Sequence, residues 1–525
     1  MHEIVTLQFG NQSNYLGTHF WNAQESYFTY SGEEESPVDH DIHFRTGVGA
    51  DGSDTFTPRT VIYDLKDNFG TLRQTNALYE SEQEANPAGL WQGNPIIQQQ
   101  PAIPPHDYQL HLESGLPAPS ISPSSIRFWS DYNRLFYHPR SLVQLHIPTS
   151  HLQISETQLS PFDRWDVGED LFKSEDQEHD LLDRDLRPFI EECDQMQGLQ
   201  VITGADDAWA GFASKYVERI RDEFGRKSVW VWGLEESRNV SREKRLSQLI
   251  NSARSFQTLA SQASLYIPVS NTPSRQAPSY LSLNTSSMWQ TSALQTAAIE
   301  STTLPSRLKV TSNRSRTTLD DIENIFTTEA KRNILQLGFR AADPDELDNH
   351  GVNGNGRHPH DSRMTNGITD YDDSPREPEM LGIDLFRTTP SNSGRNSRSH
   401  TFARVNLIRG SFALDRDVEE MESDRRAHPQ GQQAIIQQYS SPLLLSLPSS
   451  YPPIFEFSSH RSKDEVAVHA SLSSSSDVAG RIRSLADIVR RSVGMEEREG
   501  LRADLLTMAE EYVNGWEEGS SEDDE

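Results

Sequence analysis

The sequence has almost no cysteine, and Cys193 is the single one among 525 residues. One cysteine excludes an intrachain disulfide framework, which fits a reducing compartment. A reactive thiolate needs an electropositive setting, but the neighbours Glu191, Glu192 and Asp194 are acidic. Cys193 is therefore predicted to be a packed, unreactive thiol.

Long apolar runs are missing as well. No stretch approaches the ~20 apolar residues that a membrane-spanning helix needs, so no transmembrane segment is expected. The N-terminus has neither the apolar core of a signal peptide nor the Arg-rich, acid-poor pattern of a mitochondrial presequence. We expect a soluble or peripheral protein that meets any organelle at its cytosol-facing surface.

Positive charge is scarce. The chain has 48 Lys and Arg against 78 Asp and Glu, a formal net charge of -30, and such a field repels nucleic-acid backbones. Only 34% of the residues are hydrophobic, which predicts that part of the chain is disordered. Since one core rarely grows beyond about 250–300 residues, the length predicts two or three domains.

The N-terminal half is patterned as alternating strands and helices. Residues 3–9 (EIVTLQF) are strand-like, and the turn 10–13 leads into a helix whose apolar residues are helically spaced. Residues 199–203 and 228–232 are two further strands that flank a helix. This helix has Asp206 or Asp207 as N-cap and ends at Gly225. Strand, helix and strand in this order predict a parallel crossover.

The pattern is weaker beyond about residue 280. Segments 292–301 and 320–339 are helix-like, and residues 402–410 (FARVNLIRG) are strand-like. Between them, residues 342–398 are rich in Asp, Asn, Gly, Pro, Ser and Arg, which favours a disordered insertion. The last helices are amphipathic, and the chain ends in the acidic stretch WEEGSSEDDE.

The opening residues MHEIVTLQFGNQSNYLGTHFWN resemble the start of tubulins, M-R-E-I-V, then Q-x-G-Q-x-G-N-Q-x-G-x-x-F-W. The stretch 58–73 (PRTVIYDLKDNFGTLR) is similar to a second tubulin motif, and 193–203 (CDQMQGLQVIT) is similar to a third. Within that superfamily, SDYNRLFYHPRSL at 130–142 and FIEECDQMQGLQ at 189–200 look most like the Misato family, fungal type, which is tied to mitochondrial distribution and mitochondrial DNA inheritance.

The resemblance implies an α/β, tubulin-like fold. A parallel Rossmann-type nucleotide domain would be followed by a second α/β domain and C-terminal helices, with disordered insertions. We expect the first domain to span residues 1–280, with loops at 31–58 and 90–125. The second domain is expected at 281–341 and 399–470, interrupted by the insertion 342–398. The C-terminal helices are expected at 471–514 and the acidic tail at 515–525.

The resemblance also places a nucleotide pocket, but its phosphate loop is altered. Tubulins have G-G-G-T-G-S-G where this chain has GADDAWAG at 204–211, one residue shorter. Phosphates need glycines there, because a Cβ keeps backbone N–H groups away. Asp206 and Asp207 would also repel phosphate, since like charges ~4 Å apart cost about 4 kcal/mol at a dielectric of about 20. That is roughly a thousandfold in affinity.

Some polar positions of the pocket survive. By resemblance, the vestigial pocket comprises Gly10, Asn11, Gln12, Asn14, Lys66 and Asn271. Lys66 stands where tubulins have an acidic residue, and a cation cannot hold magnesium. The tubulin loop that completes hydrolysis is not recognisable, so no catalytic residue, metal or cofactor is expected.

Simpler interpretations apply to several of these residues. Asp206 and Asp207 are also good helix caps, and Trp209 fits a core position as well as a base-stacking platform. His350, His358 and His360 lie in a low-complexity tract, which favours chance over a metal site. The hydrolase motifs G-x-S-x-G and H-E-x-x-H do not occur.

Three functions are compatible with the sequence. The first is a non-catalytic tubulin-fold protein in mitochondria and cytoplasm, which acts in mitochondrial partitioning through surface, cytoskeletal or chaperonin partners. The second is an active GTP-binding tubulin homologue that polymerises or joins microtubules. The third is an acidic scaffold whose insertion and tail recruit partners. The mitochondrial element comes from the resemblance alone.

Overall fold

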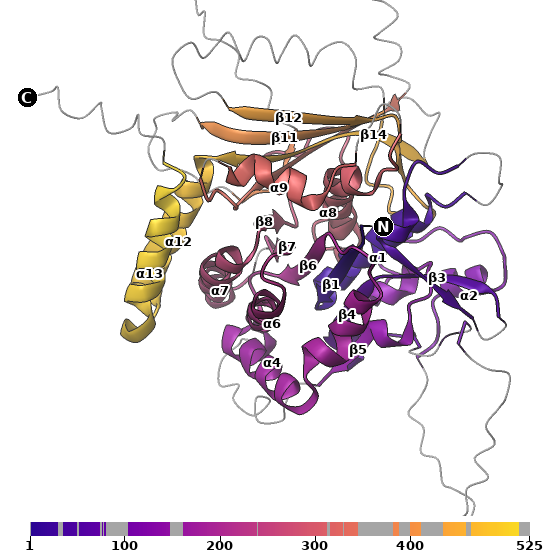
Figure 1. Ribbon diagram of the computed structural model, residues 1–525, viewed down its shortest axis with the longest axis horizontal. Helices are drawn as coiled ribbons and strands as arrows, with labels where there is room; N and C mark the ends of the chain where they lie inside the picture. Colours follow the sequence, from indigo (N-terminus) through magenta and orange to yellow (C-terminus); the bar gives the residue numbers. More distant parts are fainter. Residues whose placement is uncertain are drawn as a thin grey trace, which may run out of the picture.

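The structure is a computed structural model (Figure 1). It describes residues 2–29, 35–49, 52–73, 76, 78–79, 103–146, 161–238, 240–311, 316–328, 330–344, 382–387, 399–410, 434–457 and 464–513.

The N-terminal half is built on a six-stranded parallel sheet in the order β5-β4-β1-β6-β7-β8. Its central strands are buried along their whole length, as expected of a parallel sheet covered on both faces. This confirms the predicted parallel crossover. The strands are β1 (Ile4–Phe9), β4 (Thr60–Leu65), β5 (Leu142–Leu145), β6 (Gly198–Gly204), β7 (Ser228–Glu235) and β8 (Leu265–Ser270).

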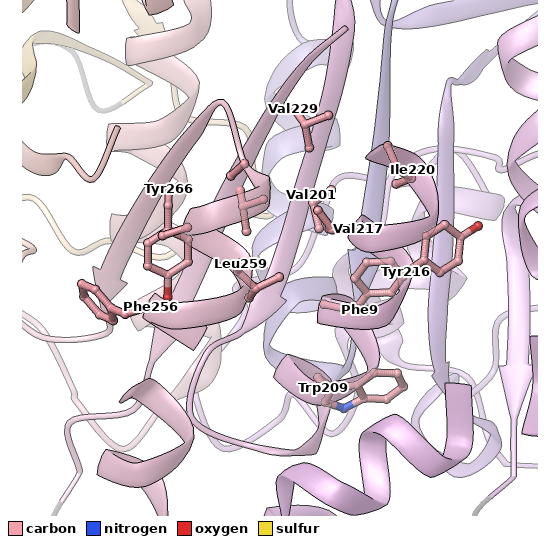
Figure 2. Packing of buried hydrophobic residues seen from close by; sticks show 14 of the residues in the cluster. Phe9, Val201, Trp209, Tyr216, Val217, Ile220, Val229, Phe256, Leu259 and Tyr266 are labelled. Atoms are coloured by element: carbon pink, nitrogen blue, oxygen red, sulfur yellow. The ribbon is translucent and has the colours of Figure 1, made fainter. Parts of the chain in front are cut away.

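Helices cover both faces because alternate strand residues point to opposite sides. Val5, Leu7 and Phe9 pack with α4 (Trp165–His179), α6 (Ala208–Phe224) and α7 (Arg242–Gln262), and Figure 2 shows part of this core. The other face packs against α1 (Asn11–Glu25) and α8 (Met288–Thr303). Gly17 of α1 lies so close to Gln8 that a Cβ there would overlap its side chain.

A second sheet packs on the far side of α8 (Figure 1). Its order is β10-β9-β14-β11-β12, antiparallel except for the pair β11–β12, and β13 pairs with β14. Residues 291–308 are buried without interruption, so α8 forms a shared core between the two sheets. The strands are β9 (Gln336–Ala342), β10 (Ile383–Asp384), β11 (Thr401–Arg409), β12 (Ile435–Ser441), β13 (Leu445–Ser446) and β14 (Glu465–Ser475), and α9 (Leu319–Thr327) precedes them.

The chain returns to the first sheet at its end. Helices α12 (Asp477–Ser492) and α13 (Met495–Glu510) pack on each other and on α7, beside which they stand in Figure 1. Their apolar residues belong to the same core as those of α6 and α7. Arg254 of α7 forms a two-bond ion pair with Glu497, at 2.7 and 2.8 Å. The C-terminal helices are thus part of the N-terminal unit.

Two predicted loops contain regular structure. Within 31–58, β2 (Phe44–Val48) and β3 (Asp54–Pro58) form an antiparallel hairpin. Within 90–125, residues 107–113 form the short helix α2 (Asp107–Glu113), anchored by the buried Tyr108. The prediction that these two segments are loops was wrong, because the surrounding glycine, proline and acidic residues obscure their short apolar patterns.

Three predicted boundaries are also wrong. Segment 320–339 is helical only to Thr327, since its end pairs with β14 as strand β9. The predicted insertion 342–398 contains β10, which pairs with β9, while most of the rest lies outside the described residues. Residues 471–475 belong to β14, so the C-terminal helices begin at Asp477. The acidic tail also lies outside the described residues.

Smaller elements connect these units. A π-helix at 182–186 leads into α5 (Arg187–Glu191), after which Cys193 is partly buried. Burial, the largest cause, raises the pKa of the Cys193 thiol to about 11. A thiol that resists ionisation is a poor nucleophile, as predicted.

Candidate functional site

The predicted nucleotide pocket would lie at the carboxyl ends of β1, β4 and β6. There Gly10 directly follows β1 and has a φ of 89°, a backbone conformation that favours glycine. Its N–H donates to the carbonyl of Tyr63 at 2.9 Å. Helix α1 starts directly after it, with the N–H of Asn14 donating to the Gly10 carbonyl. The first turn therefore keeps the tight geometry that the sequence predicts.

The space over Gly10 is filled by the indole of Trp209. A Cβ on Gly10 would lie 2.3 Å from the Trp209 ring, so the two residues touch directly. Trp209 is 4% exposed and packs edge-on against Phe162 and Phe212. Figure 2 shows it at the first turn of α6, below Phe9. Trp209 is thus a core residue, which is the simpler of its two interpretations.

Asp207 caps α6 with its own carboxylate. Its Oδ1 accepts the backbone N–H of Trp209 at 2.9 Å, which confirms the predicted N-cap. The carboxylate also fills the space beside Gly204, where a Cβ would lie 2.5 Å from Oδ1. Burial, followed by the charge of Asp163 and then Glu236, raises the pKa of Asp207 to about 7. The helix N-terminus is therefore occupied by an internal acidic group.

Asp206 turns away from α6 toward the end of β7. Its Oδ2 accepts the N–H of Glu236 at 2.8 Å, and its carbonyl accepts the side-chain N–H of Asn251 at 3.1 Å. Burial, and then the neighbouring charge of Asp207, raise the pKa of Asp206 well above the ordinary range. The two adjacent carboxyls both accept backbone N–H groups, but burial and the neighbouring carboxylates disfavour their charged forms.

A third buried carboxylate, Asp64, organises the β4 end of the site. It accepts four hydrogen bonds, from the side chains of Asn14 (2.8 Å), Asn68 (2.7 Å) and Trp129 (3.2 Å) and from the N–H of Leu65 (2.8 Å). Burial raises its pKa to about 6 despite these donors. Asp64 is part of the second tubulin-like motif, but the sequence alone did not identify it as a site residue.

The predicted pocket residues are only partly brought together. Asn14 and Gly10 share the first turn with Asp64, and the side-chain nitrogen of Asn11 lies 3.7 Å from the Met288 sulfur. Gln12 is half-buried and Lys66 is exposed. Asn271 lies on another part of the sheet edge, where its Oδ1 accepts the N–H of Ser237 at 2.9 Å and its own N–H donates to the Glu235 carbonyl.

A buried ion pair at the same sheet edge was missed by sequence analysis. Glu235, at the end of β7, accepts two 3.0 Å hydrogen bonds from Arg481 of α12, and both residues are at most 3% exposed. The two residues are far apart in the sequence, so no local pattern links them. The pair ties the C-terminal helices to the candidate site.

The described residues also bear on membrane insertion and metal binding. None of the described helices combines the length and apolar character needed to cross a lipid bilayer. Within the same part of the chain, His, Cys, Asp and Glu side chains form no group of three that could hold a metal ion. The predicted chance cluster His350, His358 and His360 lies outside these residues.

Comparison with known proteins bears on the whole chain. Residues 2–114 match the Misato Segment II tubulin-like domain, and residues 118–308 match a tubulin domain. Protein DML1 of Phaeosphaeria nodorum is 47% identical over the full length of both chains, and Protein dml-1 of Neurospora crassa is 43% identical over the full length of both. Protein dml1 of Schizosaccharomyces pombe is 33% identical, over 65% of this chain and 73% of its own.

The two domain matches together span residues 2–308, and the relatives from Phaeosphaeria nodorum and Neurospora crassa match over the whole chain. The resemblance that the opening residues carry to tubulins, and more closely to Misato, is confirmed. The chain belongs to the Misato/DML1 family of tubulin-like proteins.

Proposed function

We propose that this tubulin-fold protein acts by binding partner proteins, without turning over GTP, in the partitioning of mitochondria and the inheritance of mitochondrial DNA. The observation that carries the non-catalytic part is the packing at the start of α6. There Asp207 accepts the N–H of Trp209, and the Trp209 indole lies against Gly10. A bound phosphate would compete for that N–H group and that space.

The electrostatics of the site support the same proposal. The raised pKa values of Asp206 and Asp207 arise first from burial and then from neighbouring carboxylates. Negative charge there is already poorly compensated, so the charges of a triphosphate would add to the repulsion. Among the predicted pocket residues, Lys66, exposed just after β4, is the one cation, and Arg245 of α7 offsets part of the charge of Asp206.

Nucleotide binding is the direct test. Equilibrium dialysis of the purified full chain with radiolabelled GTP, with and without Mg²⁺, should give no stoichiometric binding at micromolar concentrations. Purified tubulin measured in parallel serves as the positive control. Stoichiometric micromolar binding that requires Mg²⁺ would contradict the proposal.

The alternative is an active GTP-binding homologue that polymerises or associates with microtubules. The feature that favours it is the preserved first turn, where Gly10 keeps its positive φ and Asn14 still contacts Asp64. Co-sedimentation with and without taxol-stabilised microtubules separates the two functions. A GTP-dependent pellet would support the alternative, and its absence together with no GTP binding would support the first proposal.

The mitochondrial role rests on the resemblance to the Misato family. We place the protein in the cytoplasm and at the cytosol-facing surface of mitochondria, in contact with partner proteins there, cytoskeletal proteins or a chaperonin. Protease treatment of intact, isolated mitochondria should degrade the associated protein while a matrix marker survives. Depletion of the protein should cause uneven distribution of mitochondria and loss of their DNA, and normal inheritance after depletion would refute this role.

A further inference from the structure

A cavity lies at the opposite end of the first sheet, where β4 and β5 begin. Its volume is about 290 Å³. Arg45 comes from β2, which leads through the hairpin to β4, and His138 and Arg140 lie just before β5. The cavity is lined by Arg45, His138, Arg140, Pro188, Phe189 and Glu192. It is separate from the nucleotide-like pocket, which is at the carboxyl ends of the strands.

Arginine side chains converge on this cavity in a chain whose net charge is -30. The Arg45 guanidinium lies 5.7 Å from the centre of the Phe189 ring, and its Nη2 forms a 2.6 Å ion pair with Glu192. The Arg45 Nε is buried and has no hydrogen-bond partner among the described residues. Arg45 therefore has donor capacity that its one carboxylate partner leaves unused.

His138 adds a neutral donor. Its Nδ1 accepts the backbone N–H of Arg140 at 3.2 Å, so in the uncharged ring the proton is on Nε2. Burial, followed by the charges of Arg45 and Arg140, lowers the pKa of His138 to about 4. The imidazole is therefore uncharged at neutral pH. Both arginines are close enough to add to the positive potential around its ring.

We propose that this cavity binds a phosphate-type oxyanion, held by Arg45 and Arg140 with the His138 Nε2–H as a neutral donor. The planar guanidinium group suits the bidentate binding of phosphate oxygens. Glu192 is 40% exposed along its side chain and serves as the internal carboxylate that the ligand displaces from Arg45. The Phe189 ring adds a cation–π contact to the Arg45 guanidinium.

Calorimetric titration of the full chain with inorganic phosphate at low ionic strength tests this proposal. Arg45→Gln and Arg140→Gln should each weaken binding by about tenfold or more, because each removes a charge-assisted contact. Glu192→Gln should tighten binding, because it releases Arg45 from its internal partner. That opposite sign separates a binding site from a merely structural ion pair.

Arg219→Gln is the matched control. Arg219 of α6 is a half-exposed arginine near Asp176 and Asp180, and its loss changes the net charge by the same amount. It should leave phosphate binding unchanged, and thermal unfolding of each variant checks that the fold is intact. The proposal is overturned if Glu192→Gln shows no saturable binding, or if Arg219→Gln weakens binding as much as Arg45→Gln.

The source of the phosphate group is resolved by two further titrations. O-phosphoserine that binds more tightly than inorganic phosphate would indicate a phosphorylated side chain as the ligand. Equal or weaker binding would indicate free phosphate or a small phosphorylated metabolite. Serine, which lacks the oxyanion, should not bind in either case, and saturable binding of serine would also contradict the proposal.

Discussion

At the residue scale, the contact between Gly10 and Trp209 determines how much space the first turn leaves. Gly10→Ala should lower the free energy of unfolding by several kcal/mol, because the new methyl group would overlap an indole 2.3 Å away. The positive φ of 89° adds a backbone cost of about 1–3 kcal/mol. Denaturant unfolding of wild type and variant measures the loss.

A double-mutant cycle isolates the steric part. Trp209→Ala alone should cost about 3–5 kcal/mol, as expected for a buried aromatic side chain. In that background Gly10→Ala should cost only its backbone strain, so the two changes together lose less than their sum. Strict additivity would mean that the indole does not lie over Gly10.

The pH dependence of stability should report on Asp207. Its pKa is raised to about 7 in the folded state, so the folded protein holds this proton more tightly than the unfolded chain. The stabilisation is full below the ordinary pKa near 4 and is lost as the pH rises to 7. Asp207→Asn removes this titration and can still cap α6.

Chemical denaturation of both proteins between pH 4 and 8 checks this. The stability of Asp207→Asn relative to wild type should rise with pH by up to about 1.4 kcal/mol per unit, and then level off above 7. Asp163 and Glu236 are present in both proteins, so their own titrations largely cancel. Asp206 loses in the variant the neighbouring charge that raises its pKa, which adds to the same trend. A difference that stays constant across this range would show that Asp207 ionises normally.

Local chemistry made some of these residues predictable. Asp207 as a cap and Gly10 as a turn follow from residue type and from the spacing of the helix behind them. The Trp209 indole over Gly10 and the four donors around Asp64 depend on contacts between separate strands and helices. A single sequence does not specify such contacts.

At the element scale, α12 is fixed to the first sheet by the pair Glu235–Arg481. Arg481→Met should lower the free energy of unfolding by about 3–5 kcal/mol, because Glu235 would remain buried without its cation. Hydrogen exchange should accelerate most in α12 and α13. The double variant Glu235→Leu with Arg481→Met should recover much of the lost free energy of unfolding. A double variant that is as unstable as Arg481→Met alone would argue against the pair.

Whether an element was predicted correctly from the sequence depends on whether its own pattern or its partners determine its structure. Helices α6 and α12 have one apolar face and were predicted correctly as helices. The first four residues of β9 (QLGF, 336–339) were predicted as helix because they continue directly from a helical segment, and they become a strand only through pairing with β14. Docking of the last helices on α7 is another long-range contact that their own pattern does not encode.

At the scale of the whole molecule, a buried charge network joins α8 and the end of α1, which cover the first sheet, to β11 of the second sheet. Glu300 of α8 forms ion pairs with Arg307, just after α8, and with Arg409 of β11. All three side chains are at most 1% exposed. Tyr27, just after α1, completes it by donating to Glu300 at 3.0 Å and accepting from Arg409 at 2.8 Å. The sheets therefore form one body through α8, although their sequences suggest separate domains.

The long segment between β9 and β10 can be tested for its role in that body. Because β9 and β10 are antiparallel neighbours, with Phe339 opposite Ile383, their ends are close and a short connection suffices. Replacing residues 345–381 by a short glycine-serine loop should change the free energy of unfolding by no more than about 1 kcal/mol. The deletion must spare residues 382–387, because Leu385 and Phe386 are buried.

This variant also separates partner recruitment by the folded body from recruitment by the segment. If the folded surface carries the function that we propose, the variant should support normal mitochondrial distribution when it replaces the wild-type protein. The scaffold alternative expects a stable protein that no longer distributes mitochondria. Calorimetric unfolding of the purified variant must therefore accompany the imaging, since only a folded variant with a lost phenotype favours the scaffold.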